Sequence, residues 1–365
     1  AILTMDPKNP GDVASWVDNP AARDNTQSRG VPLGAQFAGL ARWSSKMAVL
    51  HGVRGESVNH PSAVWQLIRM RRRVTPNVPG ILDVIARHRD GQPLGPLTAG
   101  TMMDRNYTSR WLPIATAQVP GRESMEQGLA PFDTMDPGEL AALARVMRAH
   151  TRETSLRPAD RESYGQVAAY LERLPTLPKF VTDDWAENGL VQEEAAGMKR
   201  LLWCLENDLS PGGIVSITRS NWDTHAFNLV RQKNVNAAFV QLLDKFLEQL
   251  STRRNQYGTL LEQTTIVMAG ELGRVARLNA AEGKDHSPTV SMILMGAGIA
   301  TGSNGIVVGQ TDREMRGLPL DPASGRIIGT RHTQLDDVGT TLLHLFGIEP
   351  TEYGYAGRVI EPLLA

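Results

Sequence analysis

The residue types that could do chemistry gather between Gly212 and His286. Five of them are histidines or acidic residues that could bind a metal ion: Asp223, His225, Glu271, Asp285 and His286. Neutral imidazole nitrogens and carboxylate oxygens suit divalent metals. A metal bound there could polarise a phosphoryl or sulfuryl oxygen, or lower the pKa of a bound water. This stretch therefore predicts a site for a divalent metal, with zinc, manganese, iron or calcium as the expected cofactor.

Two short apolar runs must position these residues. Ile214–Ile217 and Thr265–Ala269 are flanked by glycine and rich in β-branched residues, as in the buried strands of a parallel sheet. Between them, residues 229–254 have one apolar face with helical spacing. A right-handed crossover would place both strand ends at the same edge of the sheet. The sequence therefore predicts an α/β fold with a mostly parallel central sheet and the candidate ligands at one edge.

Each candidate also has an ordinary structural explanation. Asp223 could cap the turn that follows it, and His225 could hydrogen-bond a backbone carbonyl. Asp285 could pair with Lys284 or Arg274 in a solvated loop. One such residue alone favours the structural explanation, whereas their clustering at two strand ends favours the metal site.

A further predicted strand, Met47–Val53, is followed by a glycine-containing loop that carries His60. Loops at strand ends commonly carry functional residues. His60 could be another metal ligand or a phosphate contact. It could equally form the N-terminal cap of a helix that starts at Ser62, with Pro61 in the first turn. The sequence does not separate these alternatives.

Several short motifs resemble one known family. They are Trp222-Asp-Thr-His225, Gly270-Glu-Leu-Gly-Arg274, Gly283-Lys-Asp-His-Ser-Pro288 and Met295-Gly-Ala-Gly-Ile299, with Asp6-Pro-Lys near the start and Leu342–Ile348 near the end. Together they are similar to the domain of unknown function family 1501, which is placed in the alkaline phosphatase and sulfatase superfamily. The resemblance implies one alkaline phosphatase-like domain over residues 1–365, folded as a three-layer sandwich. It also implies an exported protein of the periplasm or cell surface.

The resemblance implies catalytic roles as well. Superfamily enzymes place a metal-binding Asp and a hydroxyl nucleophile just before the Asp-Pro-Lys segment, where this sequence has Leu3 and Thr4. Thr4 is therefore the candidate nucleophile, with His60 and Arg274 as auxiliary catalytic groups. An Asp-His pair usually follows the second central strand, where this sequence has Glu271 and a leucine. The site could thus hold one metal rather than two, or none.

Two functions from different classes follow. The first is metal-dependent hydrolysis of phosphate or sulfate esters, with a small anionic ester as the substrate. The second is a catalytically degenerate accessory or structural subunit of a larger exported assembly, which the departures at Leu3 and Leu272 favour. Residues 91–137 lack sustained periodicity and are expected to form an irregular insertion that could contact protein partners.

The overall composition is that of a globular protein, with 365 residues, 41% of them hydrophobic, and a net charge of -1. This near-neutral charge gives no reason to expect a nucleic acid partner. No apolar run approaches the length of a membrane-spanning helix. The single cysteine, Cys204, excludes an intramolecular disulfide and is expected to be buried. The start at Ala1, without an initiator Met, is expected of a processed or trimmed chain.

Overall fold

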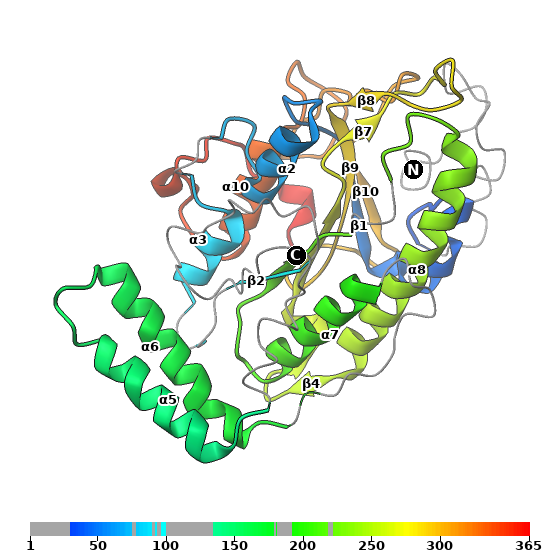
Figure 1. Ribbon diagram of the computed structural model, residues 1–365. Coiled ribbons are helices and arrows are strands. Elements are labelled where there is room, and N and C mark those ends of the chain that lie inside the picture. The colour runs from blue at the N-terminus through cyan, green and yellow to red at the C-terminus, as the bar shows by residue number, and fades with distance from the viewer. Residues whose placement is uncertain are drawn as a thin grey trace. The chain divides into compact units, whose positions relative to one another are not determined.

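The computed structural model describes residues 30–74, 78–89, 92, 96–99, 134–178, 180, 192–217 and 222–365 (Figure 1). The chain divides into two compact units. The first consists of residues 1–76, 220–247 and 261–365, and the second of residues 77–219 and 248–260. Thr4 and most of the predicted insertion at 91–137 lie outside the described residues.

The first unit contains a four-stranded sheet, a small two-stranded sheet and several helices, where η denotes a 3₁₀ helix. Its elements are η3 (Ala35–Lys46), β1 (Met47–Arg54), α2 (His60–Arg69), the first part of α8 (Asn228–Thr252), α9 (Leu260–Gln263), β6 (Thr265–Ala269), β7 (Gly273–Arg274), β8 (His286–Ser287), β9 (Thr289–Gly296), β10 (Ile306–Val308), α10 (Leu335–Leu345), η6 (Pro350–Tyr353) and η7 (Glu361–Leu363).

The four-stranded sheet has the order β10-β1-β9-β6. β1 pairs with β10 in parallel, whereas β9 is antiparallel to both β1 and β6. The predicted strands at Met47–Val53 and Thr265–Ala269 are therefore confirmed, but the sheet that they join is mostly antiparallel. The reason is that β6 and β9 are joined through residues 270–288 without a crossover helix, and such a connection returns the chain in the opposite direction.

The other predicted strand pairs elsewhere. Ile214–Ile217 corresponds to β3 (Gly213–Val215), which pairs in parallel with β2 (Leu97–Ala99) in a separate two-stranded sheet. The helix predicted at 229–254 is confirmed as α8, and residues of its apolar face such as Val235 and Leu242 are buried. The mixed α/β class is thus confirmed. The prediction that Ile214–Ile217 and Thr265–Ala269 lie in one parallel sheet is wrong, because they belong to different sheets.

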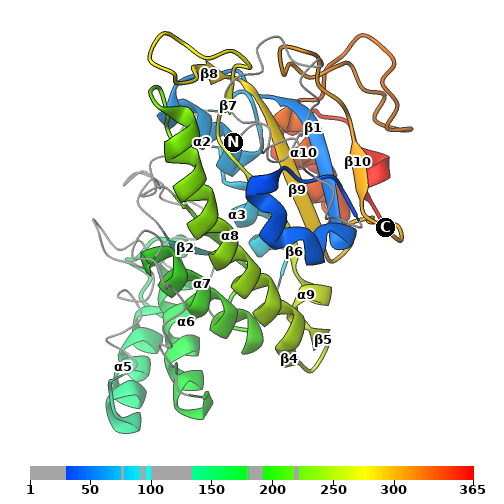
Figure 2. The same ribbon diagram turned by 90° about the vertical axis from the view of Figure 1, so that its right-hand side faces the viewer.

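β1 lies at the centre of the core of the first unit, with every residue buried except Arg54. Helices cover both faces of the sheet: α2 and α10 lie on one face, and η3 and the first part of α8 on the other (Figures 1 and 2). η3 is fixed to α8 by the ion pair between Arg42 Nε and Asp244 Oδ1, at 2.7 Å. An apolar strand such as Met47–Val53 suits a position that is covered on both faces.

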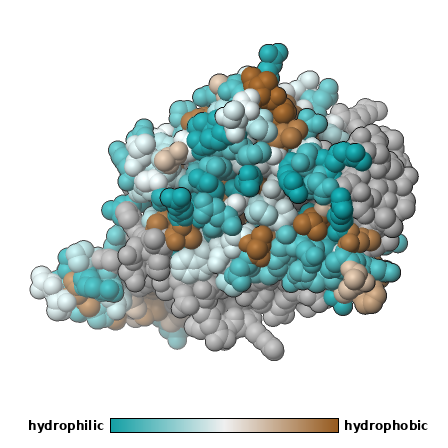
Figure 3. Space-filling model, turned by 90° about the horizontal axis from the view of Figure 1, so that it is seen from above, coloured by the Kyte–Doolittle hydropathy of each residue, from teal (hydrophilic) through white to brown (hydrophobic). Residues whose placement is uncertain are grey.

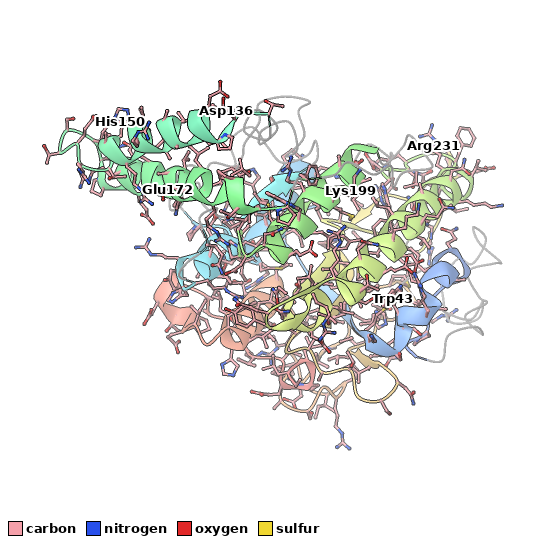
Figure 4. All side chains as sticks on the ribbon, turned by 90° about the horizontal axis from the view of Figure 1, so that it is seen from below. Trp43, Asp136, His150, Glu172, Lys199 and Arg231 are labelled. Atoms are coloured by element: carbon pink, nitrogen blue, oxygen red, sulfur yellow. The ribbon has the colours of Figure 1, made fainter. Side chains whose placement is uncertain are left out.

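The second unit is mainly helical. Its elements are α3 (Ile81–Arg87), β2, α5 (Pro137–His150), α6 (Pro158–Arg173), η4 (Leu174–Thr176), α7 (Gln192–Glu206), β3, the end of α8, β4 (Arg254–Asn255) and β5 (Gly258–Thr259). Figure 4 shows α5 and α6 side by side, with Asp136 at the start of α5, where its side chain accepts hydrogen bonds from the first helical turn. Cys204 is buried in α7, as predicted. Among the described residues, no helix combines the length and apolar character needed to cross a membrane.

Candidate metal centre

Strand ends in the first unit bring the candidate residues together. β1 and β6 both run antiparallel to β9, so they end at the edge of the sheet where β9 begins. The loop after β1 leads to His60, Glu271 follows β6, and His286 lies in β8 just before β9. β7 and β8 mark this end of the unit in Figure 1. Residues far apart in the sequence therefore meet at one edge.

Asp223 supplies the carboxylate on which the histidines converge. Its Oδ1 accepts a hydrogen bond from Arg274 Nη2 at 2.5 Å, and Arg274 Nη1 donates to the carbonyl of Lys284 at 2.9 Å. The Arg274 side chain is only 8% exposed. Burial raises the pKa of Asp223, but the hydrogen bond from Arg274 and the positive charge of Arg274 outweigh that effect and hold the pKa of this carboxyl well below its ordinary value. Asp223 is therefore an ionised carboxylate held by a buried arginine.

The three histidines share one arrangement, in which Nδ1 lies beside an oxygen that can only accept a hydrogen bond. The contacts are His60 Nδ1 to Glu271 Oε1 at 2.6 Å, His225 Nδ1 to Asp285 Oδ1 at 3.3 Å, and His286 Nδ1 to the Val58 carbonyl at 2.7 Å. A carboxylate or a carbonyl oxygen accepts, so each Nδ1 is placed to donate to it. In the tautomer that makes this bond, the Nε2 atom keeps a lone pair, and the Nε2 atoms of His225 and His286 lie 3.0 Å apart.

These Nε2 atoms all face Asp223. The distances are 3.3 Å from His60 Nε2 to Oδ2, 3.1 Å from His225 Nε2 to Oδ1, and 3.2 Å from His286 Nε2 to Oδ1. His60 Nε2 is buried and has no hydrogen-bond partner in the part of the chain that the structure describes. Lone pairs and a carboxylate at such distances repel one another unless a cation, either a proton or a metal ion, lies among them.

The segment that carries Asp223 and His225 is held by the loop between β7 and β8. Lys284 N donates to the carbonyl of Thr224 at 3.0 Å, and Phe227 N donates to the carbonyl of Ala281 at 3.1 Å. Gly283 approaches this segment so closely that a Cβ atom there would lie 1.9 Å from the carbonyl carbon of His225. The absence of a side chain at residue 283 therefore allows the loop to position His225.

Every predicted site residue except Thr4 lies in or beside this cluster. Glu271 and Asp285, predicted as metal ligands, are the acceptors behind the rings of His60 and His225. Their roles as ligands stay predictions. Arg274, predicted as a catalytic group, contacts Asp223.

The alternative structural explanation for Asp285 was a pairing with Lys284 or Arg274. Lys284 Nζ donates instead to the Ala276 carbonyl, at 2.8 Å, and Arg274 contacts Asp223. Hydrogen bonds from Asn279 and then His225 hold the pKa of Asp285 below its ordinary value. Asp285 thus accepts hydrogen bonds from residues of the cluster, whereas Lys284 contacts the Ala276 carbonyl.

His60 is more central than its sequence context indicated. Asn59 is the N-cap of α2, and its side chain accepts from Ser62 N at 3.4 Å, so the ring of His60 is not needed as a cap. Its position in the loop after β1 identified His60 as a candidate. That β1 and β6 end at the same edge was not predicted, because the pairing of both strands with β9 cannot be seen in the local sequence.

The donor set fits a divalent transition metal. Possible ligand atoms of His60, Asp223 and His286 all lie within 4.8 Å of one another. His225 adjoins this group from the solvent side, with 48% of its side chain exposed. An oxygen acceptor behind each metal-binding imidazole is the usual outer contact of such ligands. Three imidazoles favour zinc, iron or manganese over calcium, which prefers oxygen ligands.

Fold and site together define a mixed α/β protein with a histidine and carboxylate cluster that is suited to a transition metal. The chain belongs to the family described as "Protein of unknown function (DUF1501)", which matches residues 4–361. This membership confirms the family that the motifs indicated. A comparison with curated proteins finds no match.

Proposed function

We propose that this protein binds one divalent metal at His60, Asp223, His225 and His286 and hydrolyses phosphate or sulfate esters with it. The observation that carries the proposal is the convergence of three Nε2 atoms on one ionised carboxylate, with an oxygen acceptor behind each ring. The resemblance to the alkaline phosphatase and sulfatase superfamily supports this reaction class. Membership of that superfamily, its three-layer sandwich and a location outside the cytoplasm are parts of the same proposal.

The metal, when bound, supplies Lewis acidity toward an ester oxygen or a water. The residues of the chain do the rest. The Asp223 carboxylate would offset the positive charge of the metal, and Arg274 keeps that carboxylate ionised and oriented. Glu271 and the Val58 carbonyl hold two of the rings so that Nε2 points inward. Thr4 remains the proposed nucleophile.

Access to the site is from the side of His225 and Asp285. Their side chains are 48% and 61% exposed, whereas Arg274 is buried. Figure 3 looks onto the end of the first unit that carries β7 and β8, where hydrophilic residues predominate and hydrophobic ones form small separate groups. Such a surface suits a small charged ester better than an apolar substrate.

A second candidate is a structural metal site in a non-catalytic accessory protein. The observation that favours it is that four protein groups face one another, since structural zinc sites are closed by four protein ligands whereas catalytic sites keep one position for water or substrate. The departures at Leu3 and Leu272 agree with this candidate.

The first prediction concerns the carboxylate. Asp223→Ala and His286→Ala should each abolish stoichiometric metal binding, because either change removes a donor from the cluster. His150→Ala is the matched control, since His150, the last residue of α5, pairs with Glu153 away from the cluster (Figure 4). The measurement is elemental analysis of the purified proteins, followed by assays of wild type against aryl phosphate and aryl sulfate esters.

Each result has a distinct meaning. Metal in wild type and in His150→Ala but not in the two site variants supports the ligand assignment. Ester hydrolysis that is lost with the metal then supports the enzyme. A bound metal with no hydrolysis favours the structural site, and a wild-type protein that binds none of the transition metals contradicts the proposed centre.

A further inference from the structure

We propose that Asn279 is a positioning residue that fixes the ring of His225 through Asp285. The inference concerns the cluster described above and rests on the proposed function only for its consequence, metal affinity. Among the described residues, the hydrogen bonds of the Asn279 side chain go to Asp285, to the backbone of His225 and to backbone amides of its own loop, and none goes to a ring nitrogen or to Asp223.

The contacts of Asn279 use both ends of its side-chain amide. Nδ2 donates to Asp285 Oδ1 at 3.2 Å and to the backbone carbonyl of His225 at 3.1 Å. Oδ1 accepts from the backbone amides of Ala281 at 3.0 Å and Gly283 at 2.9 Å. The oxygen therefore shapes the loop, and the nitrogen holds both the backbone of His225 and the acceptor behind its ring.

His225 needs such support more than the other two histidines. Its side chain is 48% exposed and that of Asp285 is 61% exposed, whereas the His60 and His286 side chains are 21% and 17% exposed. Packing therefore restricts the rings of His60 and His286. The ring of His225 is held instead by polar contacts, with Asp285 at Nδ1 and with Asp223 and His286 at Nε2. Asn279 also contacts Asp285 Oδ1, the acceptor behind this ring.

The two roles of Asn279 can be separated by one substitution. Asn279→Asp keeps an oxygen that accepts from Ala281 and Gly283, so the loop is retained. It removes both Nδ2 donors and places a second carboxylate beside Asp285, which drives that residue away from His225. The matched control is Asn255→Asp, because Asn255 Oδ1 accepts from Tyr257 N at 2.9 Å in a similar turn outside the cluster.

The test begins with metal-free protein at about pH 9, where imidazoles of ordinary pKa are neutral. Long-range proton–nitrogen NMR spectra report which ring nitrogen of each of the eight histidines carries the proton. His225→Gln assigns the signal. We expect His225 in wild type and in Asn255→Asp to carry its proton on Nδ1, and Asn279→Asp and Asp285→Ala to give a mixture of the two forms. An unchanged His225 signal in Asn279→Asp overturns the inference.

The second arm measures zinc affinity by competition with a chelator. Outer contacts of metal-binding histidines typically contribute 10- to 100-fold, so we expect about that loss in Asn279→Asp and none in Asn255→Asp. If Asn279 acts through Asp285, the double variant Asn279→Asp, Asp285→Ala should bind zinc as Asp285→Ala does, because changes to one chain of contacts are not additive. Additive losses overturn the inference. A wild type that binds no zinc contradicts the proposed function instead, and the NMR result still decides the role of Asn279.

Discussion

The carboxylates of this site fall into two kinds, which differ by the atoms that they face. Asp223 faces the Nε2 atoms of all three histidines, whereas Glu271 and Asp285 face Nδ1 atoms. Sequence alone identified all three as acidic candidates for one site. It could not distinguish the two kinds, because the difference depends on which side of an imidazole ring a carboxylate occupies.

A prediction at this scale concerns Glu271. Glu271→Gln keeps an oxygen that accepts from His60 Nδ1 but removes the negative charge behind the ring, so zinc affinity should fall by roughly 10-fold. The matched control is Glu153→Gln, because Glu153 Oε1 lies 2.6 Å from His150 Nδ1, the same distance as in the Glu271 and His60 pair. Competition with a chelator measures both. Equal losses in the two variants would show that Glu271 has no special role.

At the scale of elements, the cluster depends on how the loop between β7 and β8 meets the segment before α8. β7 and β8 pair through Gly273 with Ser287 and Arg274 with His286, which sets the two ends of the loop. Backbone hydrogen bonds then attach the loop to residues 224–228. The segment that carries Asp223 and His225 thus takes its position from a loop about sixty residues later in the chain.

Gly283→Ala tests this dependence. The new Cβ would lie 1.9 Å from the His225 carbonyl carbon, so the backbone must shift, and overpacking of this kind costs about 1–3 kcal/mol of unfolding free energy. We expect that loss in chemical denaturation, together with weaker zinc binding. The control is Gly165→Ala within α6, where the added Cβ would meet only the Thr151 side chain at 3.6 Å. Unchanged stability and affinity in Gly283→Ala would contradict the close approach.

Much of the local structure was predictable, and the pairing was not. Apolar runs located β1 and β6, and helical spacing located α8, because these patterns reflect burial along one segment. The prediction of a mostly parallel sheet was wrong because β9 lies between β1 and β6 and is antiparallel to both. No local feature of β1 or β6 indicates that β9 is their common neighbour. The same missing neighbour concealed the central position of His60.

At the scale of the whole molecule, the candidate site belongs to one of the two units. All the residues of the cluster lie in the first unit, although α8 extends from the first into the second. A ligand that binds only the folded state stabilises it by about 2.7 kcal/mol at 100 times its dissociation constant. The increase in stability on metal binding should be largest in the segments that carry the metal-binding residues.

Amide hydrogen exchange can show which segments are stabilised by the metal. On addition of zinc, we expect slower exchange in the segments at 57–62, 222–228 and 271–287 of wild type, and no change in α5 and α6. Asp223→Ala provides the control, since its exchange should not respond to zinc. A uniform response along the chain, or one centred on α5 and α6, would place the metal elsewhere.

The contacts behind the three rings connect parts of the chain that are remote in sequence; Val58 and His286, for example, are 228 residues apart. A single cysteine leaves this chain without an internal disulfide. An ion bound by His60, Asp223 and His286 would therefore cross-link distant parts of the chain in the way that a disulfide does. Cross-links that close long loops restrict the unfolded chain most. The stability of the metal-bound protein would then be unaffected by reducing agents. It would depend instead on the concentration of free metal and on the presence of chelators.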